Sequence, residues 1–344
     1  MTVVYTCDNN FVWIMGISMI SLCENNRNLA ELEIYLLGDH IREENKRMLS
    51  GIAKRYNRVC RFIDVPDLDI PHQLTSNRWP KSAFTRIFSG ELMPKDIHKV
   101  LYLDCDTIVK GNISKLEDFD TNGHVISAVK DCVSWQYKKK IGLSKNDSYV
   151  NAGVLLIDLD RLRQMNIRQM MSDFVLSHYH LISYADQDIL NGMFKGKFGV
   201  LPPEYNAMTQ VCAYSYKQIL QYRRPSAYYT EKEIENAQHN PIIIHFTTCM
   251  LNVRPWLQNS NHPWAAEFDR YQSLSPWASR AKGIARFDKK EHKIIRGVLA
   301  LPDCISYRLI GLLHAVIRPM AIMALARFNR EKKTTPNIIP LRKR

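Results

Sequence analysis

The chain has 344 residues, 46% of them hydrophobic and 24% charged, which is the composition of an ordinary globular protein with one large domain or two smaller ones. The formal net charge is +13, and the whole excess follows residue 269: Arg270–Arg344 holds 17 Lys and Arg against 4 Asp and Glu, whereas residues 1–269 hold 30 of each. This distribution excludes a uniformly basic body. It indicates a neutral body with a basic extension, of the kind that binds anionic lipid or nucleic acid.

Cysteine spacing and the length of the apolar runs indicate the cellular compartment of the protein. The eight cysteines are scattered, show no close metal-type pairing and often lie in apolar runs, so we interpret them as buried free thiols in a reducing compartment. The apolar run Phe11–Cys23 is short and no basic segment precedes it, so we expect no signal peptide. No run reaches the roughly 18–20 uncharged apolar residues of a membrane-spanning helix. Together these features predict a cytoplasmic protein.

The first 65 residues alternate between strand and helix patterns. Short apolar runs predict strands at Thr2–Cys7, Leu32–Leu37 and Val59–Val65. Length and helical spacing predict helices at Phe11–Cys23 and Arg42–Tyr56. This order is typical of a parallel sheet with covering helices. Asp8 and Asn10 then follow the first strand at its ligand-facing end, although an Asp in this place is also a common helix cap.

The run Val100–Val109 is apolar except for Asp104 and Asp106. It predicts a strand buried on both faces, and strand alternation would place both carboxylates on one face where the strand ends. Two adjacent carboxylates repel each other unless a cation lies between them. We therefore expect a hard divalent ion that also meets substrate phosphates. An acidic turn after a strand is the competing interpretation.

Further elements follow along the chain. Helical patterns are predicted at Lys81–Leu92 and Ala185–Asn191, and strands at Lys99–Leu103, Val125–Val129, Tyr149–Leu159, Phe198–Leu201 and Pro241–Phe246. Asn151 and Gly153 lie in the longest of these strands, where small residues mark a close approach of another backbone segment or a ligand. Asp186 would cap the second helix. His245 ends the last strand, where a lone His is more often structural than a ligand.

The composition changes beyond residue 277. Pro302–Phe328 is apolar but carries basic residues, which predicts one or two amphipathic basic helices lying on a membrane surface. A helical cap packed on the body is an equally good interpretation. Arg330–Arg344 contains two prolines and six basic residues, and we expect residues 331–344 to be disordered. We accordingly divide the chain into residues 1–269, 270–330 and 331–344.

Several of these signals occur in one order. They are Asp8 and Asn10, the Asp104-x-Asp106 pair, Asn151-Ala152-Gly153, Asp186-Gln187-Asp188 and His245. The ordered set resembles glycosyltransferase family 8, the retaining sugar-nucleotide transferases with the GT-A fold, and within it the bacterial lipopolysaccharide galactosyl- and glucosyltransferases. The resemblance covers Thr2 to about Trp256.

The resemblance implies a mixed, mostly parallel α/β sheet with helices on both faces, to which the basic helical extension is added. Asp104, Asp106 and His245 are similar to the ligands of a Mn²⁺ (or Mg²⁺) ion that also binds the nucleotide diphosphate. Asp8 and Asn10 are similar to residues that hold the uracil and ribose.

The remaining matched residues concern the donor sugar. By the resemblance, Arg86, Asn151, Asp186 and Gln187 hold this sugar or face its anomeric carbon. Arg254 stands where the family commonly has a Lys before Pro-Trp and would reach the diphosphate. The sequence departs from the family in the loop after His245, since Phe246–Met250 lacks the usual Gly and Pro.

The resemblance thus implies a retaining hexosyltransferase that moves glucose or galactose from a UDP-sugar to a glycan or glycolipid acceptor. A catalytically idle relative that only binds nucleotide sugar or glycan is the alternative. We favour same-face attack, with Gln187 stabilising the cationic sugar, over a covalent intermediate on the neighbouring Asp186. The acceptor is expected at the segments 130–148 and 206–238. We expect an anionic membrane surface, on the inner face of the cell membrane, as partner of the extension. No nucleic-acid module is recognisable, and we expect no nucleic-acid partner.

Overall fold

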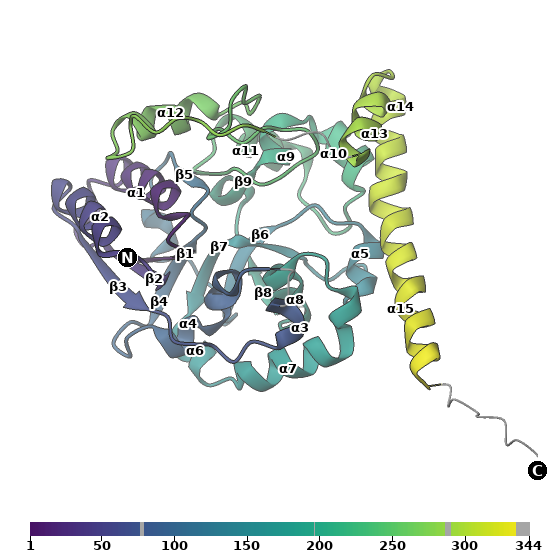
Figure 1. Ribbon diagram of the computed structural model, residues 1–344, viewed down its shortest axis with the longest axis horizontal. Helices are drawn as coiled ribbons and strands as arrows, with labels where there is room; N and C mark the ends of the chain where they lie inside the picture. The colour runs from purple at the N-terminus through teal and green to yellow at the C-terminus, as the bar shows by residue number, and fades with distance from the viewer. Residues whose placement is uncertain (76–78, 196, 286–289, 335–344) are drawn as a thin grey trace, which may run out of the picture.

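The structure, a computed structural model, describes residues 1–75, 79–195, 197–285 and 290–334. Its centre is a seven-stranded sheet (Figure 1). In spatial order the strands are β3 (Val59–Asp64), β2 (Glu33–Asp39), β1 (Thr2–Asp8), β4 (Lys99–Leu103), β7 (Val150–Asp158), β6 (Ile126–Lys130) and β8 (Phe198–Val200). All neighbours pair parallel except that β7 runs antiparallel to β4 and β6. The mixed, mostly parallel sheet is confirmed.

Both faces of the sheet are covered, because successive residues of a strand point to opposite sides. In β1, Val3 and Tyr5 enter one hydrophobic core and Val4 enters the other. The first core contains α1 (Val12–Asn25) and α2 (Glu43–Arg55), and the second contains α7 (Ile167–His178), α8 (Ala185–Met193) and the 3₁₀ helix η1 (Lys81–Phe88). The predicted helix Lys81–Leu92 is therefore a 3₁₀ helix followed by the single α-turn α4 (Ser89–Leu92).

A second, three-stranded sheet corrects our interpretation of Val100–Val109. It contains β5 (Thr107–Val109), β10 (Ile243–His245) and β9 (Ala207–Met208), in that order. The chain leaves the large sheet at Leu103 and enters the small one at Thr107. Asp104 and Asp106 thus lie in a turn between two sheets and not on one face of a continuous strand.

Short helices fill the connections. They are α3 (His72–Thr75), η2 (Ser114–Leu116), α5 (Trp135–Lys140), α6 (Leu159–Arg163), η3 (Tyr179–Leu181), η4 (Pro203–Asn206), α9 (Thr209–Ala213), α10 (Tyr216–Arg223), α11 (Glu231–His239) and α12 (Ala265–Ser273). The boundary that we predict after residue 269 falls within α12, whose Phe268 and Tyr271 are buried in the first core. All eight cysteines are free thiols, and all except Cys304 are buried, as the sequence predicts.

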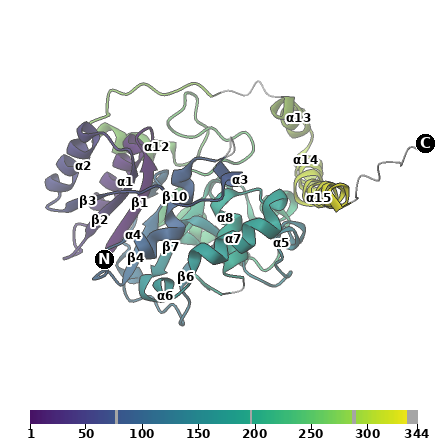
Figure 2. The same ribbon diagram turned by 60° about the horizontal axis from the view of Figure 1, so that its bottom comes forward.

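The extension is helical and lies against one side of the body beside α5 and α10 (Figures 1 and 2). It contains α13 (Lys290–Leu299), α14 (Asp303–Gly311), a π-helical turn at Leu312–Ile317 and α15 (Arg318–Thr334). The last four residues of α15 fall within the predicted disordered tail, and residues 335–344 of that tail lie outside the described residues.

One part of the extension is longer and more apolar than we expect from the sequence. Asp303–Phe328 is long and apolar enough, by length and composition alone, to cross a membrane, because a single Arg at 318 interrupts its most apolar part. The statement that no such run exists is corrected accordingly. Core helices of soluble proteins pass the same test, and this stretch buries Tyr307, Ile310 and Ala315 against the body.

Candidate active site

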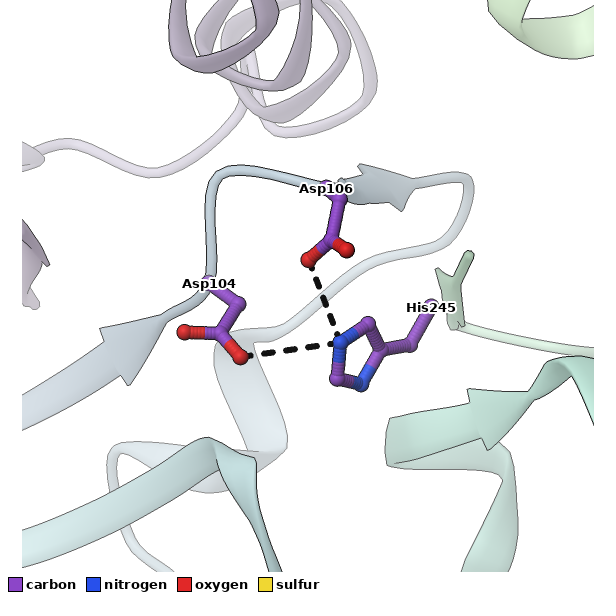
Figure 3. A group of neighbouring side chains, drawn as sticks. All are labelled: Asp104, Asp106 and His245. Carbon is purple, nitrogen blue, oxygen red and sulfur yellow. Dashed lines mark ion pairs between the residues drawn. The ribbon is translucent and has the colours of Figure 1, made fainter. Parts of the chain in front are cut away.

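Asp104, Asp106 and His245 converge at the junction of the two sheets. The Nε2 atom of His245 lies 3.2 Å from Asp106 Oδ1 and 3.6 Å from Asp104 Oδ2, and the three side chains face one another (Figure 3). Ligand atoms from all three lie within 4.8 Å of one another. Two carboxylate oxygens and one imidazole nitrogen are a donor set for a divalent cation.

The hydrogen bond on the other side of the His245 ring prepares it to be a ligand. Asn206 donates its amide proton to Asn151 Oδ1 (2.9 Å), so its own Oδ1 faces the Nδ1 of His245 at 3.0 Å. A proton on Nδ1 then satisfies Asn206 and leaves the lone pair of Nε2 directed at the carboxylates. Such an outer hydrogen bond is the usual support of a metal-binding His.

Gly153 makes room for this group. A Cβ at this position would lie 2.2 Å from His245 Cε1 and 2.8 Å from Asp104 Oδ2. The Gly153 carbonyl also accepts the backbone N–H of Asp104 at 2.7 Å, which fixes the start of the turn between the sheets. The residues present therefore fit a bound cation. They supply two carboxylates, an imidazole nitrogen that faces them, and a space beside Gly153 that the side chain of any other residue would fill.

Asp106 and His245 shift one another's pKa values. Burial alone would raise the pKa of Asp106, but His245 and then Arg254 outweigh it and lower that pKa. Burial would likewise lower the pKa of His245, and the two carboxylates raise it instead. The pKa values of Asp106 and His245 thus shift in opposite directions, because each group is the other's buried partner of opposite charge.

Arg86 ties the metal-side carboxylate to the predicted sugar-side residues. It is buried in η1, with Nη2 2.9 Å from Asp104 Oδ1, Nε 3.1 Å from Asp186 Oδ2, and its plane over the Tyr102 ring. Its Nη1 donates to the Ala152 carbonyl at 2.6 Å. Burial raises the pKa of Asp186 to about 6, although Arg86 acts in the opposite direction. Asp186 thus serves as a partner of Arg86.

The predicted helix cap is corrected here. Asp188, and not Asp186, accepts the backbone N–H groups of Ser183 (2.6 Å) and Tyr184 (3.0 Å) that precede α8. Asp188 is also bound by the Tyr149 hydroxyl at 2.6 Å and lies 3.4 Å from Lys140 Nζ. This buried network orients the first turn of α8, from which Gln187 projects.

Gln187 has all of its polar atoms engaged. Its Oε1 accepts protons from Asn151 Nδ2 (2.9 Å) and from the Ala152 backbone (3.3 Å). Its Nε2 donates to Asp131 Oδ2 (3.0 Å) and to the Tyr149 hydroxyl (3.2 Å). Since both lone pairs of Oε1 accept hydrogen bonds, this amide is a fixed dipole and a poor nucleophile.

Two cavities meet at the Asp104–Asp106 turn, and both include Arg254. One, of about 360 Å³, is also lined by Asp8 and Arg86 and is called the donor cavity below. Asp8 Oδ1 accepts the backbone N–H groups of Asn10 (2.9 Å) and Phe11 (3.2 Å), so this carboxylate shapes the entry to α1. Asn10 is exposed and, within the described part of the chain, does not line this cavity.

The other cavity, of about 470 Å³, is called the acceptor cavity below. It is lined by polar groups from the body and by two residues of the extension: Asp104, Asp106, Asp131, Asn151, Gln187, Gln210, Arg223, His245, Arg254, His314 and Arg318. Asp131 and Gln210 come from the two segments where we expect the acceptor. In the described part of the chain, Asp186 does not line either of these two cavities.

Arg254 occupies the predicted phosphate side even though the loop before it departs from the family. Its Nη2 lies 3.5 Å from Asp106 Oδ2, and its guanidinium stacks on the Trp256 ring. Its side chain is 31% exposed, so it can still bind a ligand that enters either cavity. The lengthened loop therefore leaves Arg254 beside the metal-side carboxylates.

Sequence reasoning missed Asp131, Asn206, Arg223 and Arg318. Asp131 directly follows a strand that runs parallel to β4, so the strand-end rule that selected Asp8 and Asp104 could have found it. Asn206 ends the short helix η4, six residues after β8, where no such rule selects it. The two arginines come from helices and show no pattern in the chain.

Comparisons with known proteins agree with this geometry. A family model described as "Glycosyl transferase family 8" matches residues 2–260. General stress protein A of Bacillus subtilis is 28% identical over 280 residues, covering 80% of this chain and 94% of that protein. The lipopolysaccharide 1,2-glucosyltransferase of Escherichia coli K12 is 26% identical over 313 residues, covering 87% and 88%. The solved structure of galactosyltransferase LgtC with donor and acceptor sugar analogs matches with a TM-score of 0.66 and 26% identity, covering 80% of this chain and 96% of that one.

Proposed function

The chain belongs to glycosyltransferase family 8, and from this premise we propose that it is a metal-dependent, retaining hexosyltransferase. The donor would be UDP-glucose or UDP-galactose, and the acceptor a glycan or lipid-linked glycan of a cell-surface polysaccharide. The observation that carries the proposal is the convergence of Asp104, Asp106 and His245 where the two cavities meet. A sugar held at that point would have its diphosphate in one cavity and would be within reach of an acceptor in the other.

Asp104, Asp106 and His245 would hold the divalent ion, for which we propose Mn²⁺ or Mg²⁺. When bound, the ion supplies Lewis-acid neutralisation of the leaving diphosphate. Arg254 would pair with the same diphosphate from the side, because its guanidinium suits phosphate geometry. Asp8 and Asn10 would meet the uracil and ribose. Arg86 would bind a hydroxyl of the donor sugar, with Asp186 as its positioning partner.

The geometry around Gln187 supports same-face attack over a covalent intermediate. Gln187 lines the acceptor cavity, but both lone pairs of its oxygen are in use, and Asp186 is turned toward Arg86. The acceptor hydroxyl would therefore attack from the side on which the diphosphate leaves and give its proton to a phosphate oxygen. The fixed dipole of Gln187 would stabilise the cationic sugar, with Asn151 holding the amide.

The test is release of UDP from UDP-glucose and UDP-galactose, with Mn²⁺ and with a chelator. We expect metal-dependent release, and we expect Asp106→Asn to lower it by at least about 100-fold. Asp118→Asn, at an exposed carboxylate, is the matched control. Metal-independent release, or an Asp106→Asn variant that keeps most of the rate, contradicts the ligand assignment. Nucleotide-sugar binding without any release favours the idle relative.

Retention can be tested on the same reaction. UDP-hexoses carry an α linkage, so a retaining enzyme that hydrolyses its donor slowly frees the α anomer first. Proton NMR recorded before mutarotation distinguishes the two anomers. Prompt appearance of the β anomer would contradict same-face attack.

We also propose that the extension binds an anionic membrane surface. Asp303–Phe328 exposes many large apolar side chains, namely Ile305, Leu309, Leu312, Leu313, Ile317, Met320, Leu325 and Phe328. The excess positive charge of the chain is concentrated in the same region. An exposed apolar surface with surrounding cations is typical of an interfacial helix.

Vesicle sedimentation tests this part separately. We expect binding to vesicles of phosphatidylcholine with phosphatidylglycerol, and weaker binding to phosphatidylcholine alone. Replacing Leu309 and Leu313 by Asp should reduce binding, whereas Leu176→Asp, at an exposed leucine of the body, should not. Equal binding by both variants would show that the extension does not contact the membrane.

A further inference from the structure

The outer wall of the acceptor cavity comes from the extension. His314 and Arg318 line it together with Gln187, Asp131 and Arg223 of the body. They are four residues apart, so they share one face of the helix. The family model ends at residue 260, and this wall lies beyond it.

The fold fixes the place of these two residues. Pro319 has no backbone N–H, so the Ala315 carbonyl, four residues earlier, loses its helical partner. The Ser134 hydroxyl of the body donates to this carbonyl at 2.6 Å instead. Arg223 Nη1 donates to His314 Nε2 at 3.1 Å, and the His314 ring stacks on Tyr222. The π-helical turn that contains His314 and Ala315 is thus held by the body from both sides.

Gly311 permits this close approach one turn earlier. A Cβ at this position would lie 1.9 Å from the Gln221 carbonyl oxygen at the end of α10. The helix therefore meets α10 backbone to backbone. The helix backbone at Arg318 is thus held against the body by packing and hydrogen bonds, and the exposed side chain of Arg318 lines the cavity.

The acidic groups of the cavity are committed to other partners. Asp104 and Asp106 face His245, Arg86 and Arg254. Asp131 accepts from Gln187 and from Gln210 (3.3 Å) and lies 3.6 Å from Arg223 Nη2. No ion pair or hydrogen bond involves the Arg318 guanidinium within the ranges that the structure describes. Arg318 is therefore a positive charge at the cavity that lacks an acidic partner among these groups.

We propose that Arg318, with Arg223 behind it, forms a subsite for an anionic group, a phosphate or a carboxylate, carried by the sugar acceptor. The planar guanidinium offers two parallel N–H donors to such a group, and in a partly enclosed cavity the pairing is stronger than in open water. Arg223, which is only 13% exposed, faces Asp131 and so reduces the repulsion between that carboxylate and the bound anion. The subsite would select acidic acceptor sugars over neutral ones, and it rests on the proposed function in that it assigns this cavity to the acceptor.

Binding of simple sugars tests the subsite without knowledge of the natural acceptor. The full chain is first titrated to saturation with UDP and Mg²⁺, so that the donor cavity is filled. This first titration measures UDP binding and therefore tests the proposed function separately from the subsite. Glucose and galactose are then compared with their 6-phosphates by calorimetry. We expect each phosphate to bind more tightly than its neutral sugar by roughly 10- to 100-fold, the usual value of a charge-assisted pair.

Two variants assign the effect to one residue. Arg318→Gln should bring the phosphate and neutral sugars to equal affinity. Arg308→Gln, at an exposed arginine of the same extension that does not line the cavity, should keep the wild-type preference. The proposal is overturned if wild type shows no preference or binds none of the phosphates, or if the two variants behave alike.

Vesicle binding distinguishes the other source of an anion, a lipid headgroup. With vesicles containing phosphatidylglycerol, we expect Arg318→Gln and Arg308→Gln to lose binding to the same small extent. A variant at Arg318 that selectively loses vesicle binding, yet keeps the preference for sugar phosphates, would place a lipid headgroup in this position and overturn the proposal.

Discussion

The two cavities differ in how they are built. The donor cavity is made by the body alone, and the charges on its walls already have partners: Arg86 pairs with Asp104 and with Asp186 behind it, and Arg254 pairs with Asp106. The acceptor cavity takes its outer wall from the extension, where Arg318 faces it without an acidic partner among the described residues. In the proposed function, the reaction chemistry is contained in the part that matches the family, whereas acceptor choice depends on the extension that follows it.

The largest expected effect is at the group of Asp104, Asp106 and His245, where the two cavities meet. In Gly153→Ala, the new Cβ would overlap His245 and Asp104, so the three ligands could no longer converge. We expect Mn²⁺ affinity, measured by EPR titration, to fall by about 100-fold or more. Gly51→Ala, a helical site with no neighbour within 4 Å, is the control and should be neutral or slightly stabilising. Unchanged Mn²⁺ affinity in Gly153→Ala would contradict the metal site itself.

A smaller loss of Mn²⁺ affinity is expected from Asn206→Ala, which keeps Asp104, Asp106 and His245 themselves. His245 would lose the acceptor that holds its proton on Nδ1, and outer hydrogen bonds of this kind contribute about 10- to 100-fold to metal affinity. The same EPR titration measures it, with Asn146→Ala, an exposed site, as control. If both variants bind Mn²⁺ like wild type, the orientation of His245 does not depend on Asn206.

Ser134→Ala tests whether the extension, which forms the outer wall of the acceptor cavity, is a unit separate from the body. This change leaves the Ala315 carbonyl without Ser134, and Pro319 offers no N–H in its place, which costs about 2 kcal/mol of extension docking. Hydrogen exchange of residues 303–328 should accelerate by about 30-fold while exchange in the body strands stays constant. Ser273→Ala is the control. Equal acceleration in both regions would mean that the extension is not a separate unit.

The smallest effect is a pH dependence of the same docking. Burial, then Arg223 and Arg318, lower the pKa of His314 to about 3, so the docked helix keeps this ring neutral. A released helix regains an ordinary His pKa near 6.5 and takes up a proton below it, so docking weakens as the pH falls through that value. Between pH 7.5 and 5.5 we expect up to about tenfold faster exchange in residues 303–328, after correction for intrinsic rates. His314→Gln should remove this slope, and a slope that persists in the variant contradicts the assignment.

The strands of the large sheet could be predicted from the sequence because their signal is local. Runs such as Thr2–Cys7 and Lys99–Leu103 are buried on both faces, and the observed strands end within about two residues of the prediction. Of the small sheet only β10 was predicted, within the strand Pro241–Phe246, because β5 and β9 have three and two residues, too few to show a period. For the same reason the prediction brought Asp104 and Asp106 together by strand alternation, whereas a turn between the two sheets does so.

The site was predictable where a motif marks it and not elsewhere. Asp104, Asp106 and His245 stand in an ordered pattern, and the structure brings them together. Asn206, Arg223 and Arg318 are single polar residues in unmarked segments, and only packing shows what they face. The two interpretations offered for the extension also turn out to be compatible, because one face of the helix packs on the body and the other exposes apolar side chains.

The hydrogen bonds that run from Asp131 to His245 along the acceptor cavity have a direction. Ionised Asp131 can only accept, so Gln187 must turn its NH₂ toward it and its oxygen toward Asn151. Asn151 then offers its oxygen to Asn206, and Asn206 offers its own to the His245 ring. Each amide is thereby locked head to tail, and the sequence of donors ends at the imidazole. Asp131, together with the backbone N–H groups of Ala152 and Gly153, thus fixes through three amides which nitrogen of His245 faces Asp104 and Asp106 without its proton.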